Sequence, residues 1–139
     1  MPDKLYAVTP QVRKRIVDIL SAEIAREPRI AFAFVYGSLL EQDAVHDVDL
    51  GIYLDAKPPS ASMEYMLELS ARLSQLARIP VDVRILNEAP NSFVYHVLRG
   101  RLIYCRDETQ VSDVIEGTAA RYLDIAPVLR RATREAYSP

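Results

Sequence analysis

Apolar side chains recur along the chain with the two periods that distinguish helices from strands. Near the N-terminus an apolar residue returns every fourth position, which is the spacing of one buried helix face. The residues of this stripe are Val12, Ile16, Leu20 and Ile24. Thr9 is a suitable N-cap and Pro10 a suitable first residue. The pattern therefore predicts a helix that begins at Pro10 and ends before Pro28.

Four segments have the composition of β-strands. Ile30 to Tyr36 is a continuous apolar run, and its length and aromatic content favour a strand buried on both faces. Residues 48–54 and 81–86 alternate between apolar and polar positions, which indicates strands with one buried face. Arg101 to Cys105 is predicted as a short further strand.

Helical patterns lie between these strands. The second long helix has a predicted apolar face made of Met63, Met66, Leu69, Leu73 and Leu76. A short helical stretch is predicted over 39–44. Another is predicted over 93–99, capped by Asn91 or Ser92 and closed by Gly100.

The last part of the chain, about Glu108 to Tyr137, is also helical in character, and we expect Gly117 and Pro127 to bend or divide it. Helices that alternate with strands indicate an α/β (α+β) fold. We predict a mixed sheet of about four strands with helices mainly on one face. The 139 residues are expected to form one domain, 1–139, in which 108–137 is a C-terminal helical segment.

Composition narrows the class of protein. Half of the residues are hydrophobic and 26% are charged, which is typical of a globular domain. The net charge of −2 does not indicate a membrane-binding or DNA-binding protein. The longest apolar run has seven residues, far short of the about 20 that span a membrane. Cys105 is the single cysteine, so no intrachain disulfide can form, and we expect a cytoplasmic protein.

Acidic residues mark one face of two predicted strands. Successive side chains of a strand point to opposite faces, so Asp47 and Asp49 share the face opposite the apolar one, with Cα atoms about 6.5–7 Å apart. Asp82 has the same place on the strand that begins at Val81. If the two strands share a sheet, three carboxylates converge on one surface. Their mutual repulsion is relieved either by water and salt or by a divalent cation.

Gly37 and Ser38 supply a complementary feature where the buried strand ends. A glycine permits a tight turn, and the free N–H groups of a helix that begins near Ser38 suit a phosphate. Mg²⁺ prefers carboxylate and phosphate oxygens, and two such ions can hold the attacking and leaving oxygens of a nucleotidyl transfer. Taken alone, a Gly-Ser pair is usually only a turn and an Asp-x-Asp strand only a solvated face. Their combination is what indicates a nucleotide site.

At these residues the sequence resembles the DNA polymerase beta-like nucleotidyltransferase superfamily. The resemblance lies in Val35-Tyr36-Gly37-Ser38, an eight-residue spacer, and Asp47-Val48-Asp49-Leu50, with Asp82 as the candidate third carboxylate. More narrowly, it resembles the small MNT-type antitoxins that pair with HEPN toxins. The spacer is shorter than is usual in the family. It contains Leu39-Leu40-Glu41-Gln42 where an Arg-Gly-Glu-like stretch is common.

The resemblance implies a minimal nucleotidyltransferase fold and a set of roles. Asp47, Asp49 and Asp82 would be catalytic Mg²⁺ ligands, with Asp82 alternatively a general base, and Gly37 and Ser38 would bind the phosphates of ATP. The implied reaction transfers AMP to a hydroxyl, typically of a tyrosine, on a partner HEPN toxin and thereby neutralises it.

Two alternative functions fit the same residues. A non-catalytic antitoxin would act by protein contact alone, and the shortened spacer favours it. A small-molecule nucleotidyltransferase would modify an antibiotic. The sequence leaves open whether the protein forms a homo- or hetero-oligomer.

Further residues have weaker assignments. His46 is expected to be a loop residue and His96 a structural one. Arg84 shares the face of Asp82 and is expected to pair with a carboxylate or to meet a triphosphate, and Tyr53 is a candidate for stacking on a base. Three arginines make the C-terminal helix basic, which indicates either a solvated face or a docking surface. They are Arg130, Arg131 and Arg134.

Overall fold

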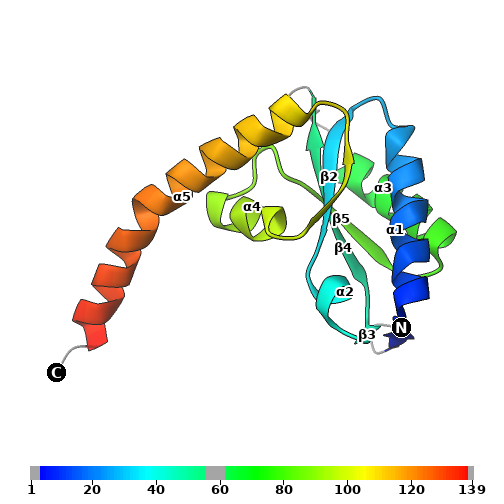
Figure 1. Ribbon diagram of the computed structural model, residues 1–139, viewed down its shortest axis with the longest axis horizontal. Helices are drawn as coiled ribbons and strands as arrows, with labels where there is room; N and C mark the ends of the chain where they lie inside the picture. Colours follow the sequence, from blue (N-terminus) through cyan, green and yellow to red (C-terminus); the bar gives the residue numbers. More distant parts are fainter. Residues whose placement is uncertain (1–3, 56–61, 138–139) are drawn as a thin grey trace.

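The computed structural model describes the backbone of residues 4–55 and 62–137 and the side chains of this part as far as residue 122. Strands and helices alternate along the chain, as Figure 1 shows. Their bounds are β1 Tyr6–Ala7, α1 Pro10–Ala25, β2 Ile30–Tyr36, α2 Ser38–Glu41, β3 Ala44–Val45, β4 Val48–Leu54, α3 Ser62–Ala77, β5 Val81–Ile85, α4 Asn91–Leu98, β6 Arg101–Cys105 and α5 Glu108–Tyr137.

The main sheet has four strands in the order β5-β4-β2-β6. β2 pairs antiparallel with both β4 and β6, whereas β4 and β5 run parallel, so the sheet is mixed as predicted. The predicted bounds of β2, β4 and β6 are confirmed, and β5 ends one residue earlier than predicted. A separate pair of short strands, β1 and β3, was not predicted from the sequence.

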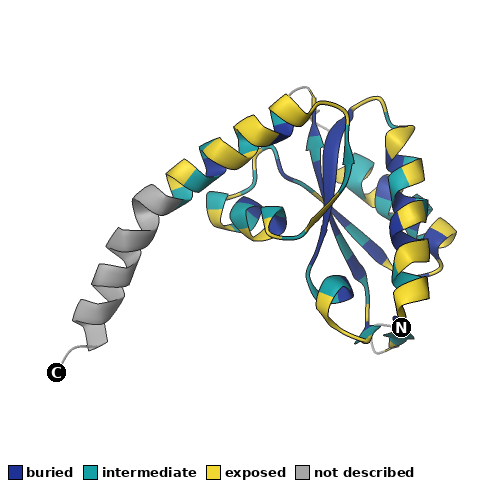
Figure 2. Ribbon diagram, viewed as in Figure 1, coloured by how far each residue is buried: buried dark blue, intermediate teal, exposed yellow. Residues whose placement is uncertain are grey.

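Both faces of the sheet are covered, which explains why all seven residues of β2 are buried. Helices α1 and α3, of 16 residues each, pack on one face, in agreement with the prediction of helices mainly on one face. Figure 2 shows α4 and the start of α5 on the other face of the sheet, and their buried residues share a core cluster with the aromatic residues of β2. Phe32, Phe34 and Tyr36 thus belong to one core cluster, while Ala33 and Val35 belong to the other.

The two long helices differ in how well their buried faces were predicted. In α1 the Thr9 hydroxyl accepts the Val12 N–H at 3.1 Å, so the predicted cap is confirmed. In α3 the prediction was partly wrong, because Met63 and Leu76 are 62% and 44% exposed. The buried stripe of α3 is made of Leu69, Leu73 and Ala77. Leu76 is turned about 100° around the helix axis from Ala77, and this rotation carries it out of the core.

Two shorter predictions were wrong. The stretch predicted as helix over 39–44 divides into α2, which ends at Glu41, and β3, which pairs with β1. α4 begins at Asn91 and its N-cap position is Pro90, which has no side-chain acceptor, so neither Asn91 nor Ser92 is the cap; the Asn91 Oδ1 instead accepts the Arg121 Nε–H of α5 at 3.1 Å. For α5 a bend or a division was expected, and the structure excludes division, because one helix runs through both Gly117 and Pro127.

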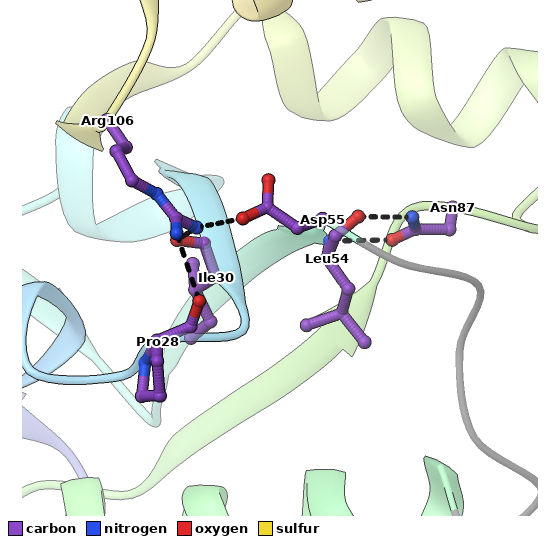
Figure 3. A network of polar contacts seen from close by, with 6 residues as sticks. All are labelled: Pro28, Ile30, Leu54, Asp55, Asn87 and Arg106. Carbon is purple, nitrogen blue, oxygen red and sulfur yellow. Dashed lines mark hydrogen bonds and ion pairs between the residues drawn. The ribbon is translucent and has the colours of Figure 1, made fainter.

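A polar network ties together the end of the sheet that lies away from α2 (Figure 3). The Arg106 guanidinium donates to the carbonyl oxygens of Pro28 and Ile30 at 3.0 and 2.7 Å and forms an ion pair with Asp55. The Asn87 side chain exchanges two hydrogen bonds of 2.8 Å with the backbone of Leu54. These contacts fix the start of β2 against the ends of β4 and β6.

α5 leaves the body of the molecule beyond α4, as Figure 1 shows. The side chains of Arg130, Arg131 and Arg134, for which a docking surface was considered, lie outside the described residues. Among the described residues, none of the helices combines the length and apolar character needed to cross a bilayer.

Candidate active site

The carboxylates identified in the sequence lie where β4 and β5 begin. The parallel register of these strands sets Asp49 directly beside Asp82, and β2 sets Tyr36 opposite Asp49 on its other side. Neighbouring strands are about 4.8 Å apart, so Asp49 and Asp82 are immediate neighbours across the sheet. Asp47 lies two residues before Asp49, just ahead of β4. The structure therefore brings the three residues to one corner of the sheet.

Alternation within the strands explains why these side chains avoid the core. Val48, Leu50 and Ile52 are fully buried beneath α1 and α3, which turns Asp49 to the opposite face. Val81 and Val83 do the same for Asp82.

Asp49 is the most strongly perturbed carboxylate of the group. Burial, and then repulsion from Asp47 and Asp82, together raise the pKa of Asp49 to about 6, although Arg84 and His96 oppose the shift. The ionised form is thus poorly compensated, and a cation at this corner would relieve it.

The donor set suits Mg²⁺ together with a phosphate ligand. Among residues 4–55 and 62–122, no three His, Cys, Asp or Glu side chains are gathered closely enough to hold a metal ion by themselves. Mg²⁺ usually takes only one or two protein carboxylates and fills its remaining positions with water and substrate phosphate oxygens. The hard oxygen donors of Asp47, Asp49 and Asp82 fit this pattern.

Arg84 supplies part of the missing positive charge. Its Nε lies 3.2 Å from the Asp82 Oδ2, so of the two roles considered for Arg84 the structure shows the carboxylate pairing. The two side chains are 58% and 44% exposed, and exposed pairs of this kind contribute only about 0–1 kcal/mol. The pair is therefore weak enough to open when a ligand arrives.

Gly37 forms a sharp corner between β2 and α2. Its φ of 81° lies in the region that favours glycine, and a Cβ at this position would lie 2.9 Å from the Asp49 Oδ2. Position 37 therefore requires glycine for two reasons: its positive φ, and the closeness of the Asp49 carboxylate, which leaves no room for a Cβ. Ser38 begins α2 directly after this corner and is half-buried.

Tyr36 and His96 were not identified as site residues from the sequence. Tyr36 is 6% exposed, and its ring meets those of Phe93 and His96 edge-on, with centroids 5.8 and 5.6 Å apart. Burial and then the charge of Asp49 raise the pKa of Tyr36 to about 12, so its hydroxyl stays neutral. The sequence did contain a signal for Tyr36: Phe32, Phe34 and Tyr36 are two residues apart, so their rings share one face of β2, and this is the face that carries Asp49. His96 is exposed and was expected to be structural, and only the packing of α4 brings it near Asp49.

The other residues considered lie elsewhere. His46 is an exposed loop residue, as expected, and its Nδ1 lies 3.0 Å from the Lys4 carbonyl oxygen. Tyr53 stacks on Phe32 with ring centroids 5.0 Å apart. It stands four residues along β4 from Asp49, about 13 Å away at the rise of a strand. A base stacked on Tyr53 would therefore lie far from the carboxylates.

The chain is similar to one protein family and to several solved structures. The family described as polymerase beta, nucleotidyltransferase matches residues 16–109. The tri-AMPylated Shewanella oneidensis HEPN toxin in complex with MNT antitoxin contains a chain with a TM-score of 0.65 and 13% identity, covering 93% of this chain and 98% of that one.

Two further toxin–antitoxin structures are similar to a comparable degree. The MntA-HepT complex gives a TM-score of 0.65 at 12% identity over 94% of this chain and 100% of that chain. A toxin–antitoxin complex with AMP-PNP gives 0.68 at 14% identity over 91% and 98%. At these identities the similarity establishes the fold. No curated protein matches the chain significantly.

Proposed function

Because this chain belongs to the polymerase beta nucleotidyltransferase family, we propose that it transfers AMP from ATP to a hydroxyl group of a partner protein. The observation that carries this proposal is the register that sets Asp49 beside Asp82, with the Gly37 corner on the other side of Asp49. Carboxylates that repel one another next to a turn suited to phosphate are what a metal-dependent nucleotidyl transfer needs.

Each residue of the corner has a role in the proposed reaction. Asp47, Asp49 and Asp82 would hold Mg²⁺, which when bound neutralises phosphate charge and polarises the α-phosphate. Gly37 and Ser38 would bind and orient the triphosphate group of ATP.

The bond changes of the reaction are those of a single displacement. The acceptor oxygen bonds to the α-phosphorus while the bond to the bridging oxygen of the β-phosphate breaks, and pyrophosphate leaves. Asp82 stands at the outer side of the group and is 44% exposed, so it is the carboxylate placed to take the acceptor proton once Arg84 moves away.

A HEPN-type toxin is the proposed partner, and a tyrosine hydroxyl of that toxin the proposed acceptor. Support comes from the similarity to chains of toxin–antitoxin complexes, one with a tri-AMPylated HEPN toxin and one with AMP-PNP. Such a pair would act in the cytoplasm. We also propose that residues 1–139 form a single domain, because α5 packs through Val111 on the same core cluster as α4 and β2.

The second candidate function is inhibition of the partner by contact without catalysis. The shortened spacer favoured it, since a distorted loop would impair phosphate binding. In the structure this spacer is well held, because Arg13 of α1 donates to the carbonyl oxygens of Leu39 and Gln42 at 2.7 and 3.2 Å, and β3 pairs with β1. An ordered spacer beside intact carboxylates supports catalysis over contact alone.

Transfer of labelled AMP tests the proposal. The purified protein, its HEPN partner, Mg²⁺ and ATP labelled in the α-phosphate are expected to yield labelled toxin. The double variant Asp47→Asn with Asp49→Asn is expected to abolish labelling while still binding the toxin. Asp43→Asn, an exposed loop carboxylate outside the site, serves as the matched control. Toxin that is bound and inhibited without label would establish the contact mechanism, and label on an aminoglycoside would establish a small-molecule enzyme.

A further inference from the structure

A cavity of about 230 Å³ opens beside Gly37, and none of the three carboxylates lines it. It is called the Gly37 cavity here. Its walls come from the end of β2, from α2 and from the end of α4, and its acidic and basic side chains are Glu41, His96 and Arg99, beside the ring of Tyr36. His96 lies in the last turn of α4 and Arg99 directly follows that helix, which was not expected to contribute to the site.

Close packing at Gly100 fixes the backbone that carries these two basic side chains. A Cβ on Gly100 would lie only 2.2 Å from the Val35 carbonyl oxygen, so the end of α4 rests directly on the end of β2. The Gly100 N–H donates to the Val97 carbonyl oxygen at 2.9 Å, and this bond ends the helix. His96 is held from the other side by its edge-on contact with Tyr36. Arg99 therefore projects from a rigid helix end.

The order of the strands shows on which side of the carboxylates the Gly37 cavity lies. Asp82 lies on β5, Asp49 on β4 and Gly37 at the end of β2, and Arg99 and Gly100 come directly before β6. In a phosphoryl-type transfer the attacking and leaving oxygens lie roughly in line on opposite sides of the phosphorus. If the acceptor loses its proton beside Asp82, the leaving group departs towards β2 and β6, where the Gly37 cavity lies.

We propose that Arg99 pairs with the terminal phosphate of ATP in the Gly37 cavity, with His96 as a second hydrogen-bond donor. This inference rests on the proposed function and assigns residues to one end of its substrate. A guanidinium presents paired N–H groups that match phosphate oxygens. Glu41 is exposed, so its carboxylate can turn to solvent when phosphate enters. Arg99 would thereby supply from α4 a charge that the short spacer after Ser38 lacks.

Calorimetric binding to three probes tests the assignment without requiring turnover. ATP with Mg²⁺, inorganic pyrophosphate with Mg²⁺, and AMP are each titrated into the full chain and into Arg99→Gln. The variant is expected to bind ATP and pyrophosphate about tenfold more weakly, the size of one charge-assisted hydrogen bond. AMP lacks the pyrophosphate end, so its affinity should stay within about twofold. Arg101→Gln, which removes an exposed arginine outside the cavity, is the matched control and should bind all three probes normally.

The outcomes separate this inference from the proposed function. Unchanged binding of ATP and pyrophosphate by Arg99→Gln would overturn the assignment and leave the proposed activity standing. An equal loss for AMP would also overturn it, because Arg99 would then act on the nucleoside end or on the fold. If the unmodified chain bound neither ATP nor pyrophosphate with Mg²⁺ present, the assignment and the proposed activity would both fall.

Discussion

Replacement of Asp49 by asparagine should make the metal-free protein more stable at neutral pH. Asp49 is half-buried beside two other carboxylates, and burial followed by their repulsion raises its pKa from 3.8 to about 6. The fold therefore tolerates the neutral carboxyl better than the charged one. Asparagine has nearly the same shape and never ionises, so the variant avoids this penalty.

The size and the pH window of the effect follow from the shift. A shift of about two pKa units corresponds to roughly 3 kcal/mol at most, and solvent screening of a half-exposed group reduces this to about 1–1.5 kcal/mol. Because the folded-state pKa is raised, the contribution of Asp49 to stability is fully present below pH 3.8 and is lost as pH rises through about 6. The free energy of unfolding of Asp49→Asn should therefore rise relative to that of the original chain between pH 4 and pH 7.

Urea unfolding at pH 4.5 and pH 7.5, with chelator and then with Mg²⁺, measures both halves of this prediction. Asp49→Asn should exceed the original chain in chelator at both pH values, by a much smaller margin at pH 4.5 than at pH 7.5. Added Mg²⁺ should stabilise the original chain at pH 7.5 by binding its folded state and should have little effect on the variant.

Asp43→Asn removes an exposed charge and should show neither effect. The reasoning fails if the stability difference between Asp49→Asn and the original chain is the same at both pH values. It also fails if Mg²⁺ stabilises the two proteins equally.

Two other substitutions test the corner and the opposite end of the sheet. Gly37→Ala places a Cβ against the Asp49 carboxylate at a positive φ, so unfolding free energy should fall by about 1–3 kcal/mol in urea titrations and AMP transfer should be lost. Gly117→Ala should instead be neutral or stabilising by up to about 1 kcal/mol, since its Cβ meets only the flexible end of Arg121, and the opposite order of the two variants would contradict the strain argument. Arg106→Gln removes bonds to two carbonyl oxygens and should cost about 1–3 kcal/mol of stability. ATP affinity measured by calorimetry should not change in that variant, and a large loss would show that the two ends of the sheet are coupled.

Local periodicity in the sequence determined the strands and the first helix. β2, β4 and β6 have the bounds that the apolar patterns predict, because a strand buried on one or both faces must carry apolar side chains at fixed intervals. The same alternation predicted that Asp49 and Asp82 point away from the core, and the register of β4 and β5 confirms that they share a face. The family was also evident from the spacing of Gly37-Ser38 and Asp47-Val48-Asp49.

Contacts between distant segments decided what the sequence did not predict. Ala44 and Val45 form a strand only because Tyr6 and Ala7 supply its partner. The Asn91 side chain, predicted as a cap, instead accepts a hydrogen bond from Arg121, thirty residues later. Such short elements form too few local hydrogen bonds to be stable alone, so their conformation depends on the segments that pack beside them.

The chemistry of the corner likewise required the tertiary structure. Residue types alone named the carboxylates, but the raised pKa of Asp49 and the pairing of Arg84 with Asp82 depend on burial and on strand order. His96 and Arg99 reach the corner only because Gly100 lets α4 rest on the end of β2. Periodicity tells which face a side chain takes, whereas electrostatic interactions depend on distances across the fold that no local pattern encodes.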